Sequence, residues 1–163
     1  MEKVKVIEIP AGKMIKTPEF AEMEDFFRIM KQLWVNVVDR HIDIFPRDFY
    51  SKNEDTKMDF WLYSIMNIDI RKFDTSGFEI IDFEGGYYAT ATTIDPDNEN
   101  TDESIQKAVQ EIKDWVNQSN FFELDFNMKR NRCLMSNRPL GDKEKDILDY
   151  IQVEIFVPIK PKK

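Results

Sequence analysis

The residue whose surroundings suggest chemistry most clearly is Glu154, an acid inside the apolar C-terminal run from Tyr150 to Ile159. Side chains of a β-strand alternate between its two faces. One face of this run is therefore aliphatic, and we expect it to lie in the core: Ile151, Val153, Ile155, Val157 and Ile159. The opposite face carries Tyr150, Gln152, Glu154, Phe156 and Pro158.

Two interpretations of Glu154 are open. In the first, it is an ordinary acid on a half-exposed strand, or it pairs with a Lys or Arg of a neighbouring strand, where an exposed ion pair contributes little stability. In the second, it is a carboxylate that recognises cations at the floor of an aromatic cleft. Ring faces then add an attraction of roughly 0.5 to 2 kcal/mol each. The pattern alone favours the first interpretation.

Other catalytic or metal-binding groups are scarce in the sequence. His41 is the only histidine and Cys133 the only cysteine, and we find no nucleophile elbow, phosphate-binding loop or metal-spaced cluster. The acidic stretch from Asp95 to Asp102 lacks the spacing and the glycine of a calcium loop. We therefore expect no catalytic constellation, no metal and no cofactor.

The composition restricts the partners and the compartment. With 31 acidic against 23 basic residues the net charge is −8, which argues against direct nucleic-acid binding because phosphate contacts depend on Lys and Arg. Such acidity usually means only good solvation, although it can also gather cationic ligands. A single cysteine fits a reducing cytoplasm, and neither a signal peptide nor a membrane span is expected. The sequence carries no indication of oligomeric state.

These groups must be positioned by strands and helices, which the periodicity of the sequence predicts. Apolar residues at helical spacing from Met23 to Val38 indicate one long helix. A second is expected after a cap at Thr101, with an apolar stripe at Ile105, Ala108, Val109, Ile112, Trp115 and Val116 and an end near Asn120. Predicted strands are Lys3–Ile9, Lys13–Lys16, Met58–Asn67, Phe78–Phe83, Tyr87–Ile94, Phe121–Phe126, Arg132–Met135 and Tyr150–Ile159, and Ser51–Lys57 is expected to be a loop.

The order of these elements repeats. Both halves of the chain, about 1–84 and about 85–163, run strand, helix, strand, strand. We therefore expect one α+β domain over residues 1–163, built from two pseudo-symmetric β-α-β-β units that form an antiparallel sheet. Two long helices would pack on one face of this sheet, which is the simplest way to bury both apolar stripes.

Three segments resemble a known family. They are similar to the signature C-terminal end, the first strand and the glycine-tyrosine-alanine strand opening of gyrase-inhibitor-like, or AraC-type, effector-binding domains. In this chain they are Ile151–Lys160, Val4–Ala11 and Phe83–Ala89, respectively. The order and spacing match over nearly the whole chain. Asn120 and the loop from Asp95 to Asp102 depart from the family, which often has glycines at the corresponding places.

The resemblance implies a fold and a ligand. It implies a shared cleft that binds drug-like molecules, often cationic and aromatic, with Glu154 as the central contact. By position, Trp61, Tyr63 and Tyr87 or Tyr88 are candidates for an aromatic wall, and core packing is the alternative for each. Many relatives carry an additional DNA-binding segment, and we expect this chain to be the stand-alone form.

Three functions are compatible with this resemblance. The leading hypothesis is a non-catalytic module that binds or sequesters lipophilic cations and that in relatives is linked to transcriptional regulation. The second is a hydrolase that acts on cyclopropane-containing electrophiles, with Glu154 as a general base on water. The third is a protein-interaction module that inhibits a partner such as DNA gyrase.

Overall fold

The computed structural model describes residues 4–16, 28, 48–52, 58–64, 79–95, 101–125, 134–137 and 151–163. Contacts divide the chain into two compact units, one of Met1–Pro10 together with Glu84–Lys163, the other of Ala11–Phe83. In the described residues the strands pair in antiparallel ladders and one long helix is present, so the fold class is α+β.

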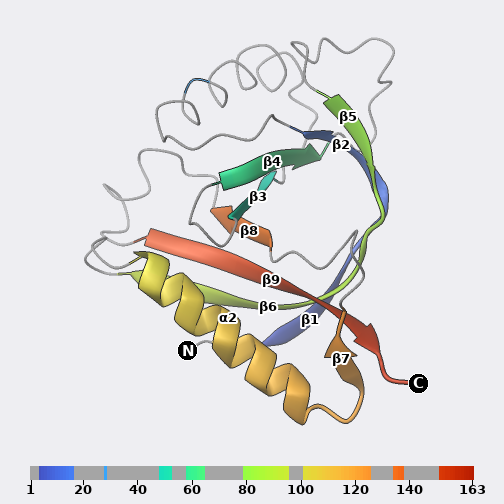
Figure 1. The fold of residues 1–163 in the computed structure, drawn as a ribbon, viewed down its shortest axis with the longest axis vertical. Helices are drawn as coiled ribbons and strands as arrows, with labels where there is room; N and C mark the ends of the chain where they lie inside the picture. The colour runs from blue at the N-terminus through green and yellow to red at the C-terminus, as the bar shows by residue number, and fades with distance from the viewer. Residues whose placement is uncertain are drawn as a thin grey trace. The chain divides into compact units, whose positions relative to one another are not determined.

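The first unit contains a sheet in the order β1-β6-β9-β8 (Figure 1). Its ladders connect β1 to β6, β6 to β9 and β9 to β8, and a short strand, β7, also pairs with β9. The strands are β1 (Lys5–Ile9), β6 (Gly86–Asp95), β7 (Phe122–Leu124), β8 (Leu134–Asn137) and β9 (Ile151–Pro161). The long pairing of β6 with β9, from Tyr87↔Ile159 to Asp95↔Ile151, makes β9 a central strand.

Strand β9 contains Pro158, which lies where the edge of β9 that faces away from β6 passes from one partner strand to another. Along that edge it pairs with β8 up to Phe156 and with β7 from Ile159. The carbonyl oxygen of Pro158, between these two stretches, accepts a hydrogen bond from the Asp125 N–H at 3.0 Å. In a β-strand the nitrogen and the carbonyl oxygen of one residue point to the same edge. The N–H that Pro158 lacks would therefore lie between the stretch paired with β8 and the stretch paired with β7. The ladder with β6, on the other edge of β9, therefore loses no hydrogen bond to the proline.

Helix α2 (Thr101–Gln118) packs against β6, β9 and β7. Its buried side chains are Ile105, Ala108, Ile112 and Val116, the spacing of one helical face. We infer that they cover the aliphatic face of the sheet, where Val153, Ile155, Val157 and Ile159 are all buried. The predicted core face of the C-terminal strand is thereby confirmed at these four residues.

One detail of the predicted helix is wrong. Trp115 was placed in the apolar stripe, but it is 38% exposed because it lies at the border of the buried face, about 100° from Val116. The helix ends at Gln118, two residues before Asn120 and thus close to the predicted end. There the hydroxyl oxygen of Ser119 accepts hydrogen bonds from the N–H groups of Phe121 and Phe122, which turns the chain into β7.

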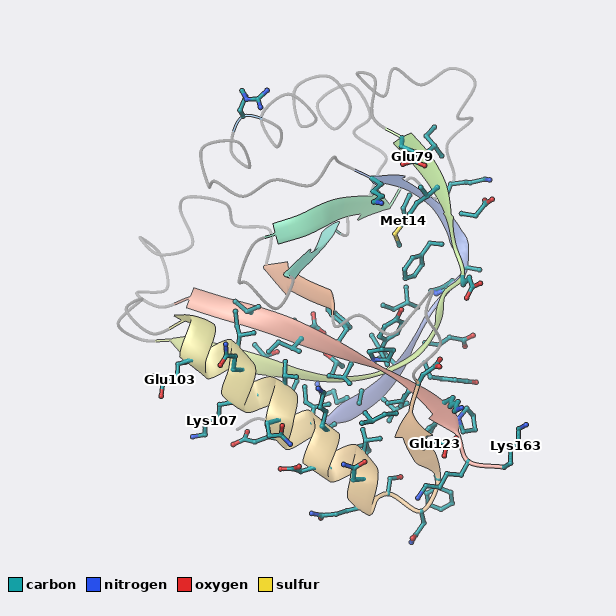
Figure 2. The ribbon with its side chains drawn as sticks, viewed as in Figure 1. Met14, Glu79, Glu103, Lys107, Glu123 and Lys163 are labelled. Atoms are coloured by element: carbon teal, nitrogen blue, oxygen red, sulfur yellow. The ribbon has the colours of Figure 1, made fainter. Side chains whose placement is uncertain are left out.

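The second unit has a sheet in the order β3-β4-β2-β5, again antiparallel. Its strands are β2 (Gly12–Lys16), β3 (Asp48–Lys52), β4 (Met58–Ser64) and β5 (Glu79–Phe83). Met14 is buried on β2 (Figure 2). Next to it, Lys13 forms an ion pair with Asp82, directly across the ladder to β5.

Strand β3 was not predicted. Ser51 and Lys52 were expected to belong to a loop, and they are its last two residues. Their polarity hides the strand in the sequence, whereas pairing with β4 supplies the backbone hydrogen bonds that hold it. A register shift between Ser51 and Lys52 ends the regular pairing.

The other predicted strands are present with ends that differ by a few residues. The predicted helix from Met23 to Val38 lies outside the described residues except for Arg28, which is helical. His41, Cys133, Tyr150 and most of the acidic stretch after Asp95 also lie outside them. The long helix from Met23 to Val38 and the pseudo-symmetry of the two halves therefore stay predictions.

Two glycines join β5 to β6. Gly85 has a φ of 68° and Gly86 a φ of 131°, and they are the positive-φ glycines of the described chain. A side chain at these φ values would clash with the backbone, most severely at Gly86. The Gly85-Gly86 pair thus allows the chain to leave the second unit at Phe83 and to begin β6 in register with β9.

Candidate functional site

The candidate site is built around Glu154 in the middle of β9. Thr92 of β6 lies directly opposite it on one side, and Ser136 of β8 occupies the opposite position on the other side. Directly opposed residues of an antiparallel ladder share a face, so these three positions form a row across three strands. The row lies on the face opposite to the aliphatic one, and Glu154 is partly buried there.

A buried hydroxyl orients the carboxylate. Thr90 Oγ1 donates a hydrogen bond to Glu154 Oε1 at 3.3 Å, diagonally across the ladder of β6 and β9. Thr90 is only 4% exposed, so one oxygen of the carboxylate has a buried hydroxyl of the sheet as a hydrogen-bond partner. Glu154 is therefore a held carboxylate rather than a mobile surface acid.

Two aromatic rings lie on the same face beside the carboxylate. Phe156, two residues along β9, packs edge to face against Tyr88 of β6, with ring centroids 6.4 Å apart and planes at 84°. Tyr88 is 1% exposed and Phe156 is fully buried. Their edge-to-face contact is a favoured arrangement of aromatic rings. In this structure both rings are core residues at the border of the site.

The remaining candidates are not brought to Glu154 within the first unit. Tyr87 points to the aliphatic face, where it is 40% exposed and contacts Phe122 with centroids 6.3 Å apart. Trp61 and Tyr63 lie on β4 of the second unit, opposite Tyr50 and Asp48 of β3. Tyr150 lies outside the described residues. A ligand-binding role for these four residues stays a prediction.

Sequence reasoning missed the hydroxyl residues Thr90, Thr92 and Ser136. Threonine is common in strands, and nothing in the sequence sets these residues apart. Only the register of β6 and β8 on β9 brings them next to Glu154. A single sequence does not specify that register, so these three residues could not be identified as neighbours of Glu154 from the sequence.

The described residues restrict the chemistry of this site. Among them no group of three or more His, Cys, Asp or Glu side chains could hold a metal ion.

The described helical segments also include none with the length and apolarity needed to cross a bilayer. What the site offers is one oriented carboxylate, hydroxyl groups and buried rings, a set suited to binding a cation through its charge and its hydrogen-bond donors.

Comparison with known families identifies the group. The sequence model of the Cass2 family, described as integron-associated effector binding protein, matches residues 11–159. The chain belongs to this family. The match contains nearly all the described strands, helix α2 and Glu154. A search of curated proteins gave no match.

Solved structures show the same fold at low sequence identity. The C-terminal domain of EcmrR has a TM-score of 0.63 and 12% identity, over 97% of both chains. SAV2435 bound to tetraphenylphosphonium has a TM-score of 0.51 and 10% identity, over 98% of this chain and 94% of that one. A hydrolase from Listeria innocua has a TM-score of 0.57 and 11% identity, over 97% and 92%. The chain thus shares its fold with these proteins, and its own family is one of effector-binding proteins.

Proposed function

We propose that this effector-binding protein holds a lipophilic cation against the carboxylate of Glu154. The observation that carries the proposal is the position of this acid, which is partly buried, fixed by Thr90 and next to two buried rings. A carboxylate in such surroundings attracts a positive charge more strongly than one in water, because less solvent screens it.

Two comparisons support this proposal. The family is defined by effector binding, and a protein of the same fold, SAV2435, was solved with tetraphenylphosphonium, a lipophilic cation. At 10% identity the likeness carries the fold and not the ligand. The ligand class of this chain therefore depends on Glu154 and its neighbours.

The test compares two xanthene dyes of opposite charge, cationic rhodamine 6G and anionic fluorescein, by fluorescence anisotropy. We expect the protein to bind rhodamine 6G and to bind fluorescein far more weakly. Glu154→Gln keeps the shape and removes the charge, so it should weaken rhodamine binding at least tenfold, or about 1.4 kcal/mol. The thermal midpoint should change little.

The matched control is Glu103→Gln. Glu103 is an exposed acid of the same unit, on the side of α2 that faces away from the sheet (Figure 2). This variant has the same net charge as Glu154→Gln, so it separates local recognition from a general loss of negative charge. Equal rhodamine affinities in the two variants would remove Glu154 from the site.

Binding is preferred over catalysis as the proposed function. The hydrolase from Listeria innocua shares the fold at 11% identity, which does not extend to its activity. Further parts of our proposal are a cytoplasmic location, recognition of several related drug-like cations, and a role of the AraC-type kind, in which ligand binding is linked to transcriptional regulation.

A further inference from the structure

We infer that the site is selective for cations that carry N–H groups, such as protonated or alkylated amines, over onium cations that carry none. This inference rests on the proposed function, because it concerns the ligand of the same carboxylate. It comes from the row Thr92–Glu154–Ser136 across β6, β9 and β8, which we call the hydroxyl row.

The first argument is the chemistry of the positions next to the carboxylate. Both directly opposed positions hold hydroxyl residues, Thr92 and Ser136, and a third hydroxyl residue, Thr90, donates to Glu154 Oε1. A hydroxyl oxygen can accept a hydrogen bond while it donates another. An N–H cation that contacts Glu154 can thus also donate a hydrogen bond to a neutral acceptor at the opposed position, Thr92.

The second argument concerns the rings. An onium cation without N–H groups is recognised chiefly by open aromatic faces and by charge. Phe156 and Tyr88, the rings closest in register to Glu154, are buried and pack against each other edge to face. Among the described residues of the first unit, the immediate surroundings of the carboxylate are therefore richer in hydroxyl groups than in open ring faces.

The third argument is the penalty for a mismatch. A ligand without N–H groups that covers the hydroxyl row displaces water from these residues. It then donates no hydrogen bond to them in place of the water. Leaving polar groups of a site without partners is the way in which binding sites reject analogues most strongly. Selectivity for N–H groups follows even where the two cations have the same charge and size.

A pair of dyes isolates this property. Rhodamine 6G carries two ethylamino N–H groups, whereas tetramethylrhodamine ethyl ester is a xanthene of the same charge and similar size whose amino nitrogens carry no hydrogen. We expect rhodamine 6G to bind at least tenfold more tightly to the unmodified protein. In Thr92→Val, which keeps the side-chain shape, the ratio should fall toward one, mainly because rhodamine 6G binds less tightly.

The control is Thr93→Val, the same substitution at the next residue of β6. Thr93 is buried on the opposite face, where its hydroxyl donates to the Val153 carbonyl oxygen at 3.4 Å. This variant should keep the dye ratio of the unmodified protein. Circular dichroism and the thermal midpoint establish that both variants are folded.

The possible outcomes separate the two proposals. Equal binding of both dyes that still depends on Glu154 would overturn the inference and leave the proposed function in place. A high ratio that persists in Thr92→Val would overturn it as well, since the selectivity would then arise elsewhere. Failure of both dyes to bind, or binding unaffected by Glu154→Gln, would overturn the proposed function and the inference together.

Discussion

At the residue scale, the properties of Glu154 depend less on its residue type than on the side chains that share its face of β9. That face was expected to be a mixed aromatic and polar surface. It contains a fully buried ring at Phe156 and a buried Pro158, so on the C-terminal side of Glu154 this face of the strand is covered by protein. The Thr90 hydroxyl stabilises the carboxylate in this position. An acid in such a place is stabilised by polar partners, and the Thr90 hydroxyl is one of them.

The rings beside Glu154 provide a test of core packing. Phe156→Ala should lower the free energy of unfolding by about 3 to 5 kcal/mol, because it removes a fully buried ring and leaves a cavity against Tyr88. The measurement is urea denaturation followed by circular dichroism. Tyr87→Ala, at a ring that is 40% exposed, is the control and should cost less than half as much. Similar losses in the two variants would contradict the assignment of Phe156 to the core.

At the element scale, the sequence predicted those elements whose signal is local. Helix α2 repeats its apolar residues every three or four positions, and β9 alternates aliphatic residues over its whole length, so each was found from its own residues. Strand β3 was missed because a polar pair at Ser51 and Lys52 ends it. What holds β3 is its pairing with β4, the next strand along the chain, and the residues of β3 alone do not reveal that pairing.

The same distinction applies to the candidate site. Glu154 was found from the alternation within β9, since an acid on an apolar strand is visible in the sequence. Thr92 and Ser136 come from two other strands, and their place beside Glu154 depends on register. A shift of one residue would move every side chain of a strand to the other face. Register is fixed by packing and turns, which a pattern of residues does not reveal.

The connection between β5 and β6 gives a prediction at this scale. Gly86→Ala should lower the free energy of unfolding by about 1 to 3 kcal/mol, because a Cβ is strained at a φ of 131°. Urea denaturation measures the change. Gly12→Ala is the control, since Gly12 lies in β2 and is not among the positive-φ glycines. An equally large loss at Gly12 would show that the effect does not arise from φ.

At the scale of the whole molecule, two kinds of electrostatic attraction act on a cation. The net charge of −8 raises the concentration of cations around the protein at long range, whereas Glu154 acts only at contact. Salt screens the first over a Debye length of roughly 30 Å at 0.01 M and about 8 Å at 0.15 M. The overall charge should therefore influence the rate of association, and the local carboxylate the rate of dissociation.

This separation can be measured by stopped-flow fluorescence with rhodamine 6G. Raising the ionic strength from about 0.01 M to about 0.15 M should slow association several-fold, because the long-range attraction is screened. Glu154→Gln changes the net charge by one unit in eight, so it should keep nearly the same salt dependence of association and release the dye at least several-fold faster. If the substitution instead abolished the salt dependence and left dissociation unchanged, Glu154 would act by steering alone, and its place at the centre of the bound state would be wrong.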